Sequence, residues 1–147
     1  MKFKDVDESV YTIEVGEVKI KPYLSAGEID TITTEMFKQD KQVQREIAKM
    51  SMITALCTNI EVPVTKTGIN CEETYDMIVS NSDLYNALMY EKIVNIDVID
   101  DIIKKTESTY KIAEDFITSL SKALEGFDMS KIQDSFTGLG DKLDGRS

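Results

Sequence analysis

The side chains that most often carry chemistry in proteins are scarce in this sequence. Its 147 residues include no His, which excludes a Ser-His or Cys-His nucleophile pair and any metal site that contains His. The two Cys residues are too few for a zinc site or for a secreted disulfide scaffold. Cys57 falls on the apolar face of an expected helix, which predicts a buried free thiol. Cys71 lies near an expected helix start, where a thiol pKa can be lowered, but no nearby base suggests a reactive role.

Carboxylates are plentiful, and three of them crowd the beginning of an expected long helix. Asp97 and Asp101 lie four residues apart on one face, with Asp100 between them, and two such groups can contribute oxygens to a Mg²⁺ site. Acidic side chains in a first turn also stabilise the helix through its dipole, and we prefer this interpretation. The glycines at 138 and 140 and the acidic stretch 141–145 match neither a phosphate loop nor an EF-hand. We therefore expect no enzyme activity, no cofactor and no metal.

The composition is that of an acidic globular protein. Hydrophobic residues make up 41% and charged residues 30%, as in an ordinary folded domain. Seventeen basic and 27 acidic side chains give a net charge of −10 without a basic cluster, which argues against direct binding of nucleic acid. No stretch is apolar over the length of a membrane span, and Met1–Asp5 lacks the apolar core of a signal peptide. We expect no membrane contact, and a location in a cytoplasm or in a particle assembled there.

The strongest pattern is an uninterrupted run of residues spaced three and four apart. Its members are Ile96, Ile99, Ile103, Thr106, Tyr110, Ala113, Ile117, Leu120, Leu124 and Phe127. This a/d heptad spacing predicts one helix about 45 Å long. Thr106, Tyr110 and Ala113 are poor seam residues for a two-stranded coiled coil, so we expect them to pack against shorter helices of the same chain. From Ile117 onward those helices are used up, which predicts contact with a second chain.

The elements before this helix are shorter. Alternating residues around Gly16-Glu17 predict a β-hairpin over 10–23, which either caps the helical core or offers an edge strand to a neighbour. Ser25 and Glu28 form a capping box for a first helix that ends near Gln39. Asp40 is expected to cap a second, well-buried helix that runs to Cys57. Two short helices follow, starting at Asn70 and near Asn81.

The last twenty residues have their own three-and-four spacing, out of phase with the long helix. We therefore expect a mainly α fold: a single domain over 1–127, in which the N-terminal β-hairpin is followed by a helical bundle with one long C-terminal helix, and an amphipathic tail over 128–147. The tail either folds back on its own domain or is an arm that orders on a partner. The candidate partner-binding residues are Ile117, Leu120, Leu124, Phe127, Met129, Ile132, Phe136, Leu139 and Leu143.

Four stretches carry a resemblance to a known group of proteins. They are Ile20-Lys-Pro-Tyr-Leu-Ser-Ala-Gly-Glu-Ile29, Arg45-Glu-Ile through Leu56-Cys-Thr-Asn-Ile60, Tyr75-Asp-Met-Ile-Val79, and Glu107-Ser-Thr-Tyr110 through Phe116. Over residues 18–125 the chain resembles small acidic virion and assembly proteins of tailed bacteriophages and prophages of Firmicutes, especially clostridia. The resemblance implies a role in morphogenesis and brings no catalytic residues with it.

Residues and resemblance together suggest a non-enzymatic phage structural or assembly protein in head, neck or tail morphogenesis. Its expected partners are other phage structural proteins or itself, as a homo-oligomer, in the virion or in the host cytoplasm during assembly. Two alternatives stay open. One is a tail assembly chaperone that leaves before maturation, and the other is an acidic inhibitor of a host immunity protein.

The tail gives a first prediction. Truncation after Gly126 should leave a folded, soluble core and abolish assembly or partner binding, and Phe136→Asp should act likewise because it places a charge in the centre of the expected contact face. Thermal melting and a binding assay measure the two effects. A truncated chain that aggregates or loses its cooperative melt would show that the tail belongs to the core, and normal assembly by Phe136→Asp would refute the contact-face assignment.

Overall fold

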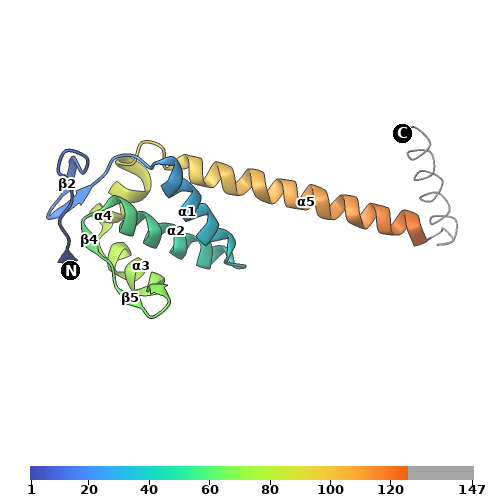
Figure 1. Cartoon of the computed structure of the whole chain (residues 1–147), viewed down its shortest axis with the longest axis horizontal. Helices are drawn as coiled ribbons and strands as arrows, with labels where there is room; N and C mark the ends of the chain where they lie inside the picture. The colour runs from blue at the N-terminus through green and yellow to red at the C-terminus, as the bar shows by residue number, and fades with distance from the viewer. Residues whose placement is uncertain (126–147) are drawn as a thin grey trace, which may run out of the picture. The chain divides into compact units, whose positions relative to one another are not determined.

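The computed structural model describes residues 1–125, which form the mainly helical chain with a small N-terminal hairpin that the sequence predicts (Figure 1). The chain divides into two compact units, Met1–Lys104 and Lys105–Ser147. This division falls inside the long helix, and the boundary that the sequence predicts between residues 127 and 128 lies outside the described residues. The expected amphipathic tail over 128–147 lies outside the described residues.

The helices and strands follow one another as short segments until the last helix. The strands are β1 (Lys2–Phe3), β2 (Ile13–Val15), β3 (Val18–Ile20), β4 (Ile60–Glu61), β5 (Val64–Thr65) and β6 (Gly68–Ile69). The helices are α1 (Ala26–Phe37), α2 (Gln42–Cys57), α3 (Cys71–Val79), α4 (Ser82–Asn86), the π-helical turn η1 (Ala87–Glu91) and α5 (Asp97–Glu125). In the first unit α2 packs between α1 and α3, and α4 with η1 closes the bundle.

The predicted hairpin is present but shorter than the range 10–23. Strand β2 pairs with β3 in antiparallel register, with Ile13 opposite Ile20 and Val15 opposite Val18. Gly16 takes a positive φ of 59° in the two-residue turn, a conformation that residues with a Cβ adopt at a cost. Val18 and Ile20 are buried in the core, so the apolar face of the hairpin covers the helices.

Helix α1 begins with the predicted capping box. The Ser25 hydroxyl accepts a hydrogen bond from the Glu28 amide, and the Glu28 carboxylate accepts one from the Ser25 amide at 2.8 Å. These contacts satisfy backbone donors that the first turn of a helix leaves free. Ile32 and Met36 are buried on its inner face, and the helix ends at Phe37, close to the predicted Gln39.

Helix α2 is well buried, as predicted, although its start is not. The predicted Asp40 cap is wrong: the N-cap residue is Lys41, which makes no side-chain cap, and Val43 in the first turn is exposed. Further along, the hydroxyls of Ser51, Thr54 and Thr58 are buried because each donates to the carbonyl four residues earlier. Local hydrogen bonds thus allow polar residues onto the buried face.

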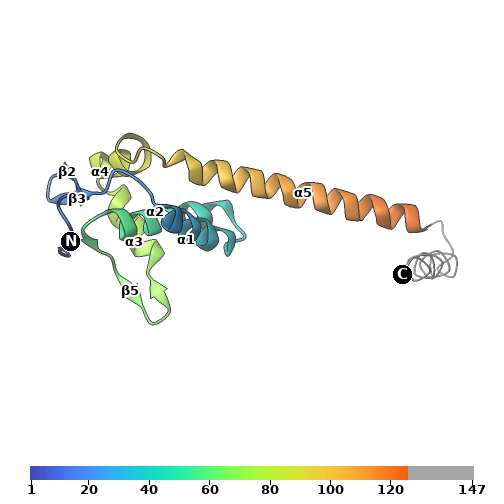
Figure 2. The same cartoon turned by 45° about the horizontal axis from the view of Figure 1, so that its top comes forward.

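Two strand pairings were missed by the sequence prediction. Strand β1 pairs with β4, with Phe3 opposite Ile60, and β5 pairs with β6 in a small hairpin that extends from the helices (Figure 2). The segment 65–68 contains the turn of this second hairpin.

The short helices start where the sequence predicts. The side chains of Asn70 and Asn81 accept hydrogen bonds from the amides of Glu73 and Leu84, three residues on, and so cap α3 and α4. In η1 the Lys92 amide reaches back to the Ala87 carbonyl. This wider turn keeps Ala87, Leu88 and Met89 on the buried side.

Burial along α5 stops after its second turn. Ile99 and Ile103 are buried in the core of the first unit, together with Ile96 just before the helix. From Lys104 to Glu125 every residue is exposed except Thr106, which is half-buried. One helix therefore continues a core face into water.

Two identical substitutions in α5 test this division. Ile99 is fully buried and Ile112 is 70% exposed. Ile99→Ala should lower the free energy of unfolding by about 2–5 kcal/mol because it leaves a cavity in the core. Ile112→Ala should change it by less than about 0.5 kcal/mol, since no packing is lost. Urea denaturation at low protein concentration measures both, and equal losses would show that the core extends along α5.

Candidate functional site

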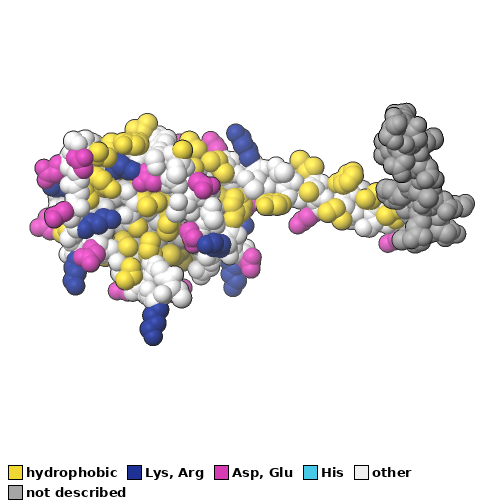
Figure 3. All heavy atoms as spheres, in the orientation of Figure 1, with side chains coloured by type: hydrophobic (Ala, Val, Ile, Leu, Met, Phe, Trp, Pro, Cys, Tyr) yellow, Lys and Arg dark blue, Asp and Glu magenta, His cyan; other side chains and the backbone are white. Residues whose placement is uncertain are grey.

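The candidate site is the exposed apolar face of α5. Tyr110, Phe116 and Ile117 are each more than 60% exposed, and Leu120 and Leu124 are exposed to lesser degrees. Figure 3 shows hydrophobic side chains along this helix. Exposed apolar side chains are common singly, but a row of them on one helix marks a surface that another element covers.

Helical geometry places these residues on the face that begins in the core. Ile103, Tyr110, Ile117 and Leu124 follow one another at intervals of seven residues, and so do Ile99, Thr106, Ala113 and Leu120. They are the a and d positions of one heptad register. Phe116 and Ala123 lie beside them at position g and widen the face. The apolar surface is therefore broader than the seam of a two-stranded coiled coil.

The predicted site residues fall into two groups. Ile117, Leu120 and Leu124 are exposed on this face, where a second chain can reach them. The other predicted residues lie outside the described part of the chain; they are Phe127, Met129, Ile132, Phe136, Leu139 and Leu143. Tyr110 and Ala113, which the sequence predicts to pack against the shorter helices, are both exposed.

Sequence reasoning missed two large residues of this surface. Phe116 is 67% exposed at position g, and Ile112 is exposed at the outer margin. A strict a/d pattern does not include either position. Both residues are found when the whole sequence is projected around the helix at 100° per residue, because the apolar arc is then wider than the a and d positions alone.

The opposite face of α5 is polar and its charges balance. Between Lys104 and Glu125 the basic residues Lys104, Lys105, Lys111 and Lys122 are matched by Glu107, Glu114, Asp115 and Glu125, so the net charge is zero. Residues 1–103, by contrast, carry 10 basic and 19 acidic side chains. The candidate surface thus belongs to a neutral helix on an acidic protein.

The start of α5 is fixed to the first unit by polar contacts. The Asn95 side chain accepts from the Leu24 amide at 2.8 Å and donates to the Leu24 carbonyl at 2.9 Å. The Lys49 ammonium, on α2, contacts both Asp100 carboxylate oxygens at 3.1 and 3.2 Å. Lys49 is nearly fully buried, whereas the Asp100 side chain is about half exposed, so the pair gives the buried ammonium a partner while its carboxylate stays in contact with water.

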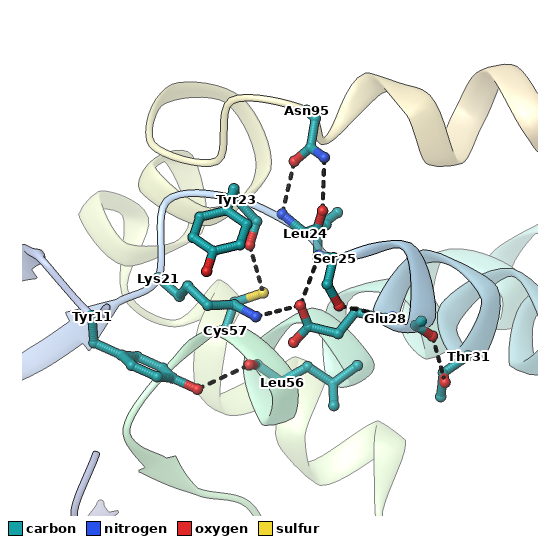
Figure 4. A network of polar contacts seen from close by, with 11 residues as sticks. Tyr11, Lys21, Tyr23, Leu24, Ser25, Glu28, Thr31, Leu56, Cys57 and Asn95 are labelled. Atoms are coloured by element: carbon teal, nitrogen blue, oxygen red, sulfur yellow. Dashed lines mark hydrogen bonds and ion pairs between the residues drawn. The ribbon is translucent and has the colours of Figure 1, made fainter. Parts of the chain in front are cut away.

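A second ion pair orders the segment that leads into α1 (Figure 4). The Lys21 ammonium donates to the Glu28 carboxylate, and both side chains are largely buried. Burial opposes the charge on Glu28, but the hydrogen bonds from Lys21 and Ser25 outweigh it and lower the pKa of this carboxyl below 4.5. Burial likewise opposes the charge on Lys21, and its hydrogen bond to Glu28 raises its pKa above 10.5. The pair is therefore ionised over the neutral range.

The acidic cluster at the start of α5 serves the helix and its anchor. Asp97 and Asp100 lie in the first turn, where negative charge is favoured by the helix dipole, and Asp100 also holds Lys49. Among residues 1–125 no group of three or more Cys, Asp or Glu side chains is arranged to hold a metal ion.

The cysteines have the surroundings of structural thiols. Burial raises the pKa of Cys57 to about 12, and the sulfur lies 3.9 Å from the Tyr23 carbonyl oxygen, to which it donates (Figure 4). Cys71, the first residue of α3, lines an open hollow beside Glu35 and Met52. Burial raises its thiol pKa, and the charge of Glu35 acts in the same direction. The lowering that a helix start can produce does not occur here, so neither thiol is activated as a nucleophile.

Comparison with protein-family models, with curated proteins and with solved structures finds no match. No helix among the described residues has the length and apolar character needed to cross a membrane.

The Lys21–Glu28 pair gives a pH-dependent prediction. Glu28→Gln should lower the free energy of unfolding at neutral pH by about 1–2 kcal/mol, through loss of a charge-assisted hydrogen bond. Because the folded pKa of Glu28 is lowered, its contribution is present above pH 4.5 and is lost as pH falls through the folded pKa. The difference between the native protein and Glu28→Gln should therefore shrink in acid.

The matched control is Glu35→Gln on the same helix. Glu35 pairs with Lys38 on the surface, at 2.7 Å, where ion pairs contribute little. Urea denaturation at neutral and acidic pH compares the two variants. A difference for Glu28→Gln that does not vary with pH would contradict the assignment.

Proposed function

We propose that this chain is a non-enzymatic protein of phage particle assembly that acts by binding protein through the apolar face of α5. One observation carries the binding part of the proposal: the row of exposed apolar residues from Tyr110 to Leu124 on a helix whose first turns belong to a core. The resemblance of residues 18–125 to small acidic morphogenesis proteins supports the phage setting. The proposed partners are other structural proteins of the particle or further copies of this chain.

Energetics supports a covered rather than a bare helix. Packing of an amphipathic face supplies most helical stability in proteins, and an uncovered apolar face lacks that contribution. Burial of a large apolar side chain contributes about 1.5–3 kcal/mol. Phe116, Ile117 and Leu120 therefore offer enough apolar surface for a protein contact.

The arrangement of charge supports a protein partner over nucleic acid. The polar face of α5 mixes both signs, and the acidic excess lies in residues 1–103. A phosphate backbone requires a basic stripe, which the described residues do not present. An apolar surface between balanced charges fits another protein surface of the same kind.

The test is made in the phage or prophage that carries the gene. Ile117→Glu places a charge in the centre of the apolar face and should lower the yield of infectious particles by about tenfold or more, because a buried unpaired charge opposes the contact. Electron microscopy should show particles arrested at one stage. Plaque counts and micrographs are the measurements.

Thr118→Glu is the matched control, since it adds the same charge one residue further on, at the centre of the polar face. It should leave the yield unchanged. Detection of the chain in finished particles separates a structural component from an assembly factor that leaves. Deletion of the gene without any effect on particle yield or form would refute the proposal.

A further inference from the structure

We propose that the partner of the α5 face is α5 of other copies of this chain, arranged parallel and in register. The inference rests on the proposed function, because it takes the same face as the contact surface and names its occupant. Three features of the described residues carry it: the continuity of the heptad, the neutrality of the helix and the place of its acidic side chains.

The heptad register does not slip between the core and the exposed part of α5. Ile99 and Ile103 occupy d and a positions in the core, and Ile117, Leu120 and Leu124 occupy the same positions 14 to 21 residues later. A repeat of this kind allows two identical helices to meet along their length, because every a and d residue faces its own counterpart in a parallel pair.

Electrostatics permits contact between copies at this helix. Two copies of residues 1–103 repel each other, since each carries nine more acidic than basic side chains. Two copies of the segment 104–125 do not, because the net charge of each is zero. Among the described residues, net charge therefore does not oppose self-association along the segment 104–125.

The acidic residues beside the seam favour the parallel direction, because they act at close range, whereas salt screens the repulsion between the more distant acidic units of two copies. Position e is occupied by Glu107 and Glu114, and position g by the uncharged Thr109, Phe116 and Ala123. In a parallel pair each e residue lies beside a g residue of the other helix, so the carboxylates meet no like charge. In an antiparallel pair e lies beside e, which brings glutamates of the two copies together. Repulsion of this kind selects orientation in coiled coils.

The large residue at g suggests more than a minimal two-stranded seam. Phe116 extends the apolar surface sideways, and Tyr110 and Ala113 are a large and a small residue at the neighbouring a and d positions. Such a broad face is covered more completely by helices on two sides than by one. A bundle of more than two copies is therefore consistent with this surface, and each pair of neighbouring helices in it would be parallel and in register.

The first part of the test is the mass of the full-length chain by light scattering behind a sizing column, over a wide range of concentrations. The native chain should show a concentration-dependent oligomer. Ile117→Glu should weaken association by about 100-fold or more, and Thr118→Glu should leave it unchanged. A monomer at every concentration would overturn the proposal, as would an oligomer that Ile117→Glu does not affect.

The second part tests direction and register by disulfide formation. Tyr110→Cys and Leu124→Cys are made separately in a Cys71→Ser background, with the background protein as control; Cys57 is fully buried. In a parallel, in-register bundle each variant forms a disulfide with its own copy on mild oxidation. An antiparallel pair brings a residue to its counterpart only at the twofold axis, so at most one of the two positions can then form a disulfide. Failure of either position overturns the parallel register.

These outcomes separate the inference from the proposed function. If the native chain is monomeric but Ile117→Glu still lowers particle yield, the α5 face binds a different protein and only the inference fails. If the chain forms the parallel bundle while gene deletion leaves particles normal, only the phage role fails.

Discussion

Water imposes the constraint from which the functional argument follows: an apolar helix face must be covered. In α5 the core of the first unit covers Ile99 and Ile103, and the same face then remains exposed through Tyr110, Ile117 and Leu124. The apolar spacing of three and four residues continues without interruption beyond Ile103, the last buried residue of the helix. A helix meant only for solvent would have polar residues at those positions. The continuation of the pattern is therefore better explained by a contact than by the needs of the fold.

The contact that we propose requires a helix start of defined position. The Asn95 side chain forms two hydrogen bonds with the backbone of Leu24. The Lys49 ammonium, on α2, forms an ion pair with Asp100 in the first turn of α5. Both contacts lie close in sequence to the buried residues Ile96 and Ile99, and together they favour one position of the first turns. The Lys21–Glu28 pair orders the segment that carries Leu24. The polar network of the first unit thus holds the first turns of α5 in place.

The sequence predicts those parts of the fold that depend on neighbours within one or two helical turns. The capping box of Ser25 and Glu28, the caps at Asn70 and Asn81 and the single long helix all follow from local spacing, and all are present. What it misses depends on partners distant along the chain. Strand β1 acquires its partner β4 almost sixty residues later, and the burial of Lys49 requires an aspartate 51 residues away. The residues next to a two-residue strand, or next to a lysine on a helix, do not indicate that such a partner exists.

The candidate site shows the same division between local and distant information. Helical periodicity is local, so the face that contains Ile117, Leu120 and Leu124 could be predicted from the spacing alone. How far the rest of the fold covers that face is not local, which is why Tyr110 and Ala113 were expected to pack against the shorter helices and are in fact exposed. Exposure beginning soon after Ile103 enlarges the surface by two turns and adds Phe116 at its side. A short apolar end suits a local contact, whereas a neutral, heptad-spaced face of this length is the surface along which the proposed association of this acidic protein meets the least repulsion.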